Sequence, residues 1–212
     1  MCETITKGAR MAAVRVERES GLTWIVLDRP RKANSLTAEM LESVRDNVRA
    51  ATTPALAITG TGRVFSGGAD LPAARAGLAA SPLWEEVSSA VANFPGLTVA
   101  ALNGSCAGGA LGMVLACDCR VAVPGATFFY PVMKHGFLPP PSDPVRLSAL
   151  INAGRAKMML MCGAKVSTEE ACAWGLVDRV VEDARAAATA LAADVLAGPE
   201  GHGATLKALF PR

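Results

Sequence analysis

The sequence predicts an α/β fold in which short buried strands alternate with helices and pair mostly in parallel. Two observations carry this prediction: apolar runs of strand length at residues 55–59 and 97–102, and apolar positions at helical spacing between the strands. Of the 212 residues, 51% are hydrophobic and 19% are charged, so the chain can bury the core of one domain. The net charge of +2 and the 5% of aromatic residues disfavour a nucleic-acid-binding surface.

The N-terminal half begins with two paired strands, expected over residues 14–16 and 22–27, with a turn at Gly21 and a stop at Pro30. A helix follows, because the apolar residues fall on one face and Glu39, Glu42, Arg45 and Asp46 lie opposite. Its buried positions are Leu36, Met40, Leu41, Val44 and Val48. Strand 55–59, a glycine-rich loop, a helix around residues 84–93 and strand 97–102 complete this half.

The C-terminal half begins with residues 108–117, which are apolar on every face and therefore predict a buried helix. Ser167 and Glu170 have the spacing of a capping box and predict a short helix that Gly175 ends. The remaining expected elements are a strand over 120–123, a helix over 145–162, an extended segment over 177–181 and an alanine-rich helix over 183–197.

The sequence also disfavours a membrane span, an export signal and a metal site. Residues 87–117 carry no charge, but Asn93, Pro95, Asn103 and several glycines divide them into pieces too short to cross about 30 Å of hydrocarbon. Residues 1–11 lack the apolar core of a signal peptide and are expected to form a flexible leader. The six cysteines form no C-x-x-C pair, and there are two histidines. Four thiols in apolar stretches are expected to be buried and free, as in a reducing cytoplasm.

Three common catalytic motifs are missing or incomplete. The glycines at residues 60 and 62 follow a strand, but Phe65 occupies the third glycine position of a dinucleotide fingerprint. A pair of glycines has P-loop spacing, but Ala110 and Leu111 stand where lysine and serine or threonine are required. No G-x-S-x-G elbow is present. A Ser-His-Asp hydrolase is therefore not supported.

Two glycine-rich segments remain, at residues 65–71 and 103–110, and each follows a buried strand. Small residues allow backbone N–H groups to approach a ligand closely. The second segment also opens a helix, whose free N–H groups favour negative charge. Two converging N–H groups would form an oxyanion hole. The alternative is that these glycines only permit tight packing of strand on helix.

The chain resembles the crotonase (enoyl-CoA hydratase/isomerase) superfamily through residues 28–36, 58–71, 99–118 and 160–181, which match its loops and signatures in order. The resemblance implies a spiral of ββα units, with residues 12–200 as the core domain and 201–212 as the start of a truncated C-terminal helical region. It also implies a CoA thioester as ligand, no cofactor apart from coenzyme A in the substrate, and a homotrimer or hexamer.

The resemblance assigns the two oxyanion donors to the backbone N–H groups of Ala69 and Gly109. The other expected binding residues are Gly67, Gly68, Asp70 and Leu71 in the first loop, and Arg31, Lys32 and Ala33 near the CoA phosphates and pantetheine. Three of these positions, Arg31, Lys32 and Asp70, have alternatives that stay open. The basic pair could form a solvated turn, and Asp70 could be a structural cap, as we also expect of Asp118.

The two glutamates that hydratases of this family use are absent. Their positions hold Gly112 and Val132, and neither side chain can activate water or move a proton. Some relatives place an aspartate at the position of Pro140, and Asp143 lies three residues beyond it.

Three ionisable residues near the expected pocket are therefore candidates for acid or base: His135, Asp143 and Tyr130. Packing or solvent exposure is the alternative for His135, for Tyr130 and for the neighbouring Lys134.

Three functions are compatible with this sequence. The chain could be an acyl-CoA enzyme with altered chemistry, such as decarboxylation, hydrolysis or isomerisation. It could be a non-catalytic acyl-CoA binder or assembly subunit, or a hydratase whose glutamates are replaced by distant groups. In each case the expected setting is fatty acid metabolism in the cytoplasm.

Overall fold

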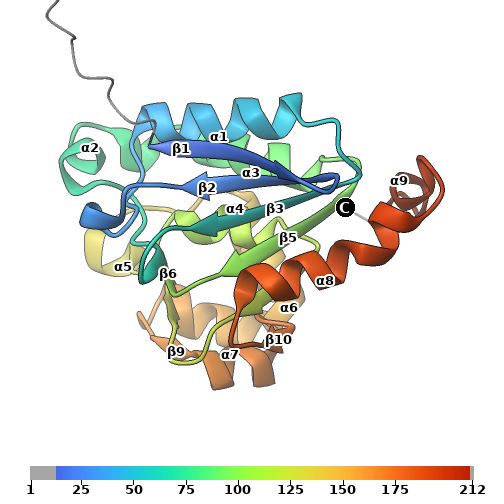
Figure 1. The fold of residues 1–212 in the computed structure, drawn as a ribbon. Coiled ribbons are helices and arrows are strands. Elements are labelled where there is room, and N and C mark those ends of the chain that lie inside the picture. Colours follow the sequence, from blue (N-terminus) through green and yellow to red (C-terminus); the bar gives the residue numbers. More distant parts are fainter. Residues whose placement is uncertain (1–12, 211–212) are drawn as a thin grey trace, which may run out of the picture.

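The computed structural model describes residues 13–210, and Figure 1 shows how its strands and helices are arranged. The leader expected over residues 1–11 lies outside the described residues. The predicted α/β class is confirmed, because a six-stranded sheet lies between helices on both of its faces. No helix in the described part of the chain is long and apolar enough to cross a membrane.

The main sheet has the strand order β1-β2-β3-β5-β7-β10. Only β1 pairs antiparallel, and it meets β2 through a two-residue turn in which Ser20 and Gly21 both have positive φ. Every other pair is parallel. The strands are β1 (Val14–Glu19), β2 (Leu22–Leu27), β3 (Ala55–Gly60), β5 (Leu97–Leu102), β7 (Cys119–Ala122) and β10 (Arg179–Val180). The sheet confirms the parallel pairing predicted from the alternation of apolar runs.

A second, smaller sheet was not predicted. Its order is β4-β6-β8-β9, with strands of two or three residues: β4 (Val64–Ser66), β6 (Ser105–Ala107), β8 (Thr127–Phe129) and β9 (Val166–Ser167). Such short strands carry no readable alternation of apolar and polar residues. The parallel pair β4 and β6 is what brings the two glycine-rich segments side by side, because each segment continues from one of these strands.

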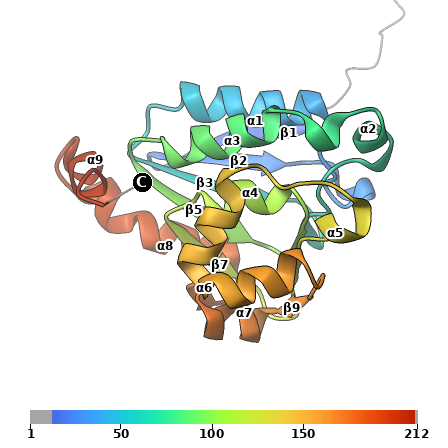
Figure 2. The same ribbon diagram turned by 180° about the vertical axis from the view of Figure 1, so that it is seen from behind.

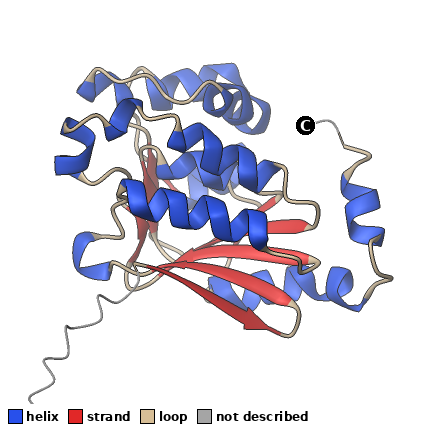
Figure 3. Ribbon diagram, turned by 90° about the horizontal axis from the view of Figure 1, so that it is seen from above, coloured by secondary structure: helices blue, strands red, loops and turns tan. Residues whose placement is uncertain are grey.

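Helices cover both faces of the main sheet, and alternate strand residues point to each face. Ile25 and Ile58 face α1, α3 and α4, whereas Trp24 and Ala57 face the alanine stripe of α8. Figures 2 and 3 show the two layers from behind and from above. The helices are α1 (Ala38–Ala50), α2 (Leu71–Arg75), α3 (Leu83–Ala92), α4 (Ala110–Leu115), α5 (Val132–His135), α6 (Ser142–Leu160), α7 (Thr168–Trp174), α8 (Ala184–Ala197) and α9 (His202–Lys207).

Several expected boundaries need correction. The first helix begins at Ala38 rather than Leu36, because the Thr37 hydroxyl accepts the Met40 N–H and caps it. The helix expected over 145–162 begins at Ser142 and is interrupted at Asn152, where φ is 68°. The capping box of Ser167 and Glu170 is confirmed, with both of its hydrogen bonds present. The helix at 108–117 is fully buried as predicted but covers only α4.

The expectation of four buried thiols is wrong for the described cysteines. Cys106 and Cys117 are buried, but Cys119 and Cys172 are partly exposed and Cys162 is exposed. Cys162 lies just beyond the end of α6, where the chain turns through solvent. Within residues 13–210, no group of three His, Cys, Asp or Glu side chains could hold a metal ion.

Candidate functional site

A buried asparagine joins the loop before α1 to the loop that carries the first expected donor. Asn34 is fully buried with a φ of 49°. Its Nδ2 donates to the carbonyl oxygens of Thr61 at 2.9 Å and Val64 at 2.8 Å, and its Oδ1 accepts from the Arg29 N–H at 2.8 Å. Sequence reasoning passed over Asn34, although an asparagine in an otherwise basic turn is a signal for a left-handed backbone position.

The backbone hydrogen bonds of residues 67–70, the loop with the first expected donor, leave the amide of Ala69 free. Gly67 N–H donates to Ala33 O, Leu36 N–H donates to Gly68 O, and Asp70 N–H donates to Leu36 O, each at 2.8 Å. Leu36 and Ala69 form an isolated parallel bridge, whose two hydrogen bonds join Leu36 to Gly68 and to Asp70, so the N–H of Ala69 takes no part in the bridge. Within residues 13–210 it donates to no acceptor.

The second loop presents a matching free amide. Gly108 N–H donates to Phe129 O at 3.0 Å, whereas the next amide, that of Gly109, has no acceptor in the described part of the chain. Gly109 is the N-cap residue, directly before the first residue of α4. The first amides of a helix have no partner within the helix and carry the positive end of its dipole.

Glycine is required where the two loops meet. Gly68 has a φ of 86°, and a Cβ there would lie 2.7 Å from the carbonyl oxygen of Ala107 and 3.4 Å from the Cα of Gly108. Gly108 also has a positive φ, 57°. Each free amide therefore follows a glycine in the left-handed region, and the contact of the two glycines holds Ala69 and Gly109 at one cavity.

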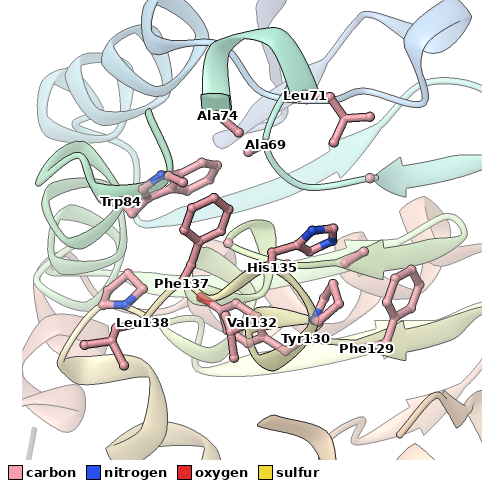
Figure 4. A pocket seen from close by; sticks show the side chains of 17 residues that line it. Ala69, Leu71, Ala74, Trp84, Phe129, Tyr130, Val132, His135, Phe137 and Leu138 are labelled. Atoms are coloured by element: carbon pink, nitrogen blue, oxygen red, sulfur yellow. The ribbon is translucent and has the colours of Figure 1, made fainter. Parts of the chain in front are cut away.

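That cavity has a volume of about 240 Å³ and is mostly apolar. Figure 4 shows the side chains that line it, with Phe137 standing between Trp84 and His135. A Cβ at Gly109 would lie 2.8 Å from the Trp84 ring, so the indole packs directly on the Cα of Gly109. The Trp84 Nε1 donates to Leu78 O at 2.7 Å and fixes the ring. Sequence reasoning missed Trp84 and Phe137 as wall residues.

A buried acid lies behind the cavity wall. The Tyr130 hydroxyl donates to Asp143 Oδ2 at 2.7 Å, and Asp143 Oδ1 has no partner within residues 13–210. Burial raises the pKa of Asp143 from 3.8 to about 6, although the Tyr130 hydrogen bond and Arg146 oppose the shift. Burial and the neighbouring Asp143 also raise the pKa of Tyr130 above its ordinary value.

Asp143 also occupies the space above Gly112. A Cβ at Gly112 would lie 2.9 Å from Asp143 Oδ1 and 3.0 Å from Oδ2. A side chain at residue 112 and the Asp143 carboxylate therefore exclude each other. The space that a side chain of residue 112 on α4 would occupy is filled by the Asp143 carboxylate of α6.

Six of the predicted site residues line the cavity, and the others lie around it. The six are Gly67, Ala69, Leu71, Gly109, Tyr130 and His135. Asp70 caps α2 by accepting from Ala73 N–H and pairs with Arg29 at 2.7 Å, which lowers its pKa. Asp70 therefore has the geometry of a structural cap.

The basic residues lie outside this cavity. Arg31 and Lys32 are exposed in a 3-10 turn, Pro30–Lys32, beside Ala33. Lys134 lines a second, more polar cavity of about 520 Å³ together with His135 and Lys165.

The expectation that Asp118 is structural agrees with its contacts. Its Oδ2 accepts from Thr98 N–H at 2.8 Å and pairs with Lys207 at 2.8 Å.

The comparisons with known proteins agree with one another. The family model described as enoyl-CoA hydratase/isomerase matches residues 17–212. The chain is 31% identical over 189 residues to the probable enoyl-CoA hydratase echA6 of Mycobacterium leprae, covering 86% of this chain and 76% of the relative. It is 32% identical over 184 residues to 4-chlorobenzoyl coenzyme A dehalogenase-2 of Arthrobacter, covering 81% of this chain and 67% of the relative.

The solved structure of Pseudomonas aeruginosa DspI superposes with a TM-score of 0.85 at 32% identity, over 97% of this chain and 83% of that one. The fold, the order of the motifs and these matches lead to one conclusion. The chain belongs to the enoyl-CoA hydratase/isomerase family, the crotonase superfamily.

Proposed function

We propose that this protein binds an acyl-CoA thioester and holds the thioester oxygen between the backbone N–H groups of Ala69 and Gly109. The observation that carries the proposal is a pair of free amides, those of Ala69 and Gly109, in two residues that line one cavity. Preorganised donors of this kind stabilise negative charge on a carbonyl oxygen, as in a thioester enolate. The apolar lining suits the acyl group.

The rest of the ligand would lie outside the cavity. The exposed cations Arg31 and Lys32 would meet the CoA phosphates, and Ala33 would contact the pantetheine arm. Coenzyme A would enter as part of the substrate, and no further cofactor is proposed. Enoyl-CoA hydratase/isomerase-like chemistry would proceed through an enolate at the two amides.

A second candidate function is binding without turnover, as an acyl-CoA carrier or an assembly subunit. The observation that favours it is that Gly112 and Val132 replace both hydratase glutamates, and Val132 lines the cavity as an apolar side chain. A binder of this kind would hold crotonyl-CoA and return it unchanged.

The test is a calorimetric titration with three ligands that differ at one group: butyryl-CoA, its thioether S-butyl-CoA, and free CoA. We expect butyryl-CoA to bind about tenfold more tightly than S-butyl-CoA, because only the thioester has a carbonyl oxygen for the two amides. S-butyl-CoA should bind more tightly than free CoA, because its butyl group contacts the apolar lining of the cavity. Equal affinities for the thioester and the thioether would contradict the proposal. Mass spectrometry of a mixture with crotonyl-CoA then separates an enzyme from a binder.

Assembly and location stay predictions. A homotrimer or hexamer is expected, and light scattering after size-exclusion chromatography would measure its mass. A monomer at micromolar concentration would contradict this expectation. A cytoplasmic location is likewise expected, and cell fractionation would test it.

A further inference from the structure

Asp143 is held in an arrangement that packing alone does not favour. Its side chain is fully buried, and one carboxylate oxygen has no partner in the described part of the chain. A buried carboxylate without a counter-ion is costly, and an apolar side chain of similar size would cost less. The carboxylate also needs residue 112 to be glycine, in the interior of a helix where glycine is disfavoured.

Tyr130 connects this buried carboxylate to the cavity. The Tyr130 side chain lines the cavity that holds the Ala69 and Gly109 amides, and its hydroxyl donates to Asp143 at 2.7 Å. Figure 4 shows Tyr130 at the floor of the cavity beside Val132, opposite Ala69. Val132, at one of the two positions where a glutamate is missing, is therefore a neighbour of a group that can carry a proton.

We infer that Tyr130 and Asp143 form the acid–base pair of this site, with Tyr130 exchanging protons with the bound acyl group and Asp143 acting through Tyr130. The inference rests on the proposed acyl-CoA function and deepens it. Tyr130 is the catalytic residue, because it lines the cavity. Asp143 is a positioning residue that orients the phenol and takes its proton.

The proposed step is a reversible proton transfer that needs no oxidant or reductant. The proton on the carbon next to the thioester moves to the Tyr130 oxygen as the phenolic proton moves to Asp143 Oδ2. The electron pair of the broken C–H bond enters the enolate, whose oxygen is held by the two amides. When the protons on Tyr130 and Asp143 exchange with solvent before the transfers reverse, the reversal restores the thioester with a solvent-derived proton on that carbon.

The charges around the pair suit this role. The ionisable groups that act on it are Glu85 from α3, Arg146 from α6 and the buried thiol of Cys106 from β6. Glu85 accepts from the Ser142 hydroxyl at 2.9 Å, and Arg146 donates to the same hydroxyl at 2.7 Å, so both are held beside Asp143 by its sequence neighbour. The pKa of about 6 that burial gives Asp143 lies close to neutral pH, where proton transfer is efficient.

The first test is the exchange of solvent deuterium into butyryl-CoA, followed by mass spectrometry. We expect exchange with the wild-type protein and a loss of about 100-fold or more in Tyr130→Phe and in Asp143→Asn. Asp118→Asn removes a carboxylate of structural role and should exchange like the wild type. Butyryl-CoA binding should stay within about threefold in Tyr130→Phe. The wild-type exchange rate should rise with pH through about 6, and Asp143→Asn should lose this rise.

The second test needs no turnover. Tyr130 is the only tyrosine of the chain, so labelling tyrosine with ¹³C at Cζ gives one NMR resonance. Its chemical shift should change with pH, with an inflection near pH 6 that Asp143→Asn abolishes.

Exchange in Tyr130→Phe at the wild-type rate would overturn the inference, as would wild-type binding of butyryl-CoA without any exchange. Failure to bind butyryl-CoA would instead overturn the proposed function itself.

Discussion

The backbone of Gly68 lies against the backbone of Gly108, so close that a Cβ at Gly68 would lie 3.4 Å from the Gly108 Cα. Each glycine has a positive φ and is followed by a residue that lines the cavity and whose amide donates to no acceptor in the described part of the chain. The two loops come from strands that pair in parallel, β4 and β6. The placement of these two amides therefore depends on a contact that only glycine permits.

The first prediction concerns this contact. Gly68→Ala should abolish the preference for butyryl-CoA over S-butyl-CoA, because its Cβ would meet the Ala107 oxygen at 2.7 Å and push the two amides apart. Gly125→Ala is the matched control. Gly125 also has a positive φ, 74°, but a Cβ there would meet nothing within 4 Å. Titration calorimetry measures both variants. A Gly68→Ala protein that keeps the preference would show that the loop contact does not set the donor geometry.

The second prediction concerns Asn34, which ties the two loops of the site together. Asn34→Ala should lower the free energy of unfolding by about 2–4 kcal/mol, since buried partners lose three hydrogen bonds. Asn152 is the control residue, because it also has a positive φ but is exposed. Asn152→Ala should lower the free energy of unfolding by about 1 kcal/mol. Urea denaturation gives both values. Equal losses in the two variants would mean that backbone strain, rather than the hydrogen bonds of Asn34, sets the cost.

The third prediction concerns pH and Asp143. The folded protein holds the Asp143 proton more tightly than the unfolded chain, because burial raises the pKa from 3.8 to about 6. This group therefore lowers stability as pH rises from about 4 to about 6, by up to about 3 kcal/mol in total. Asp143→Asn removes this pH-dependent loss. The stability of the variant should therefore increase relative to that of the wild type as the pH rises over this range.

Urea denaturation at several pH values measures the difference in the free energy of unfolding between the two proteins. The contributions of the other carboxylates cancel in this difference. A difference that does not change between pH 4 and 7 would contradict a raised pKa at Asp143.

The fourth prediction is a coupling between residues 112 and 143. Alanine normally stabilises a helix interior by about 1 kcal/mol over glycine, but Gly112→Ala should destabilise this protein by about 1–3 kcal/mol, since its Cβ would meet the Asp143 carboxylate. In an Asp143→Ala background the same change should be neutral or stabilising. A double-mutant cycle with urea denaturation gives the coupling energy. Additive effects would show that the two positions do not compete for space.

The sequence predicted most of what is local in this fold. Apolar runs and helical spacing were enough for the main sheet, for α1 and for the capping box of α7, because burial on one face determines each pattern. The two glycine-rich loops were also predicted, and they lie together as expected. The second sheet was missed because strands of two or three residues carry no period.

The missed parts of the site depend on tertiary packing. Trp84 becomes a wall residue only because α3 places it on Gly109. Asp143 was a candidate from the sequence, but its contact with Gly112 depends on how α6 packs against α4. No spacing along the chain encodes the contact of two helices that are separated by two strands and a further helix, β7, β8 and α5.

The carbonyl stretch of bound ligand tests most directly whether the two backbone amides hold the thioester oxygen, as we propose. Isotope-edited infrared difference spectra of butyryl-CoA carrying ¹³C at the carbonyl isolate this one vibration. We expect a shift to lower frequency on binding to the wild-type protein, because hydrogen bonds from Ala69 and Gly109 weaken the C=O bond, and a smaller shift in Gly68→Ala. A carbonyl that binds with its frequency unchanged or raised would contradict hydrogen bonding by the two amides.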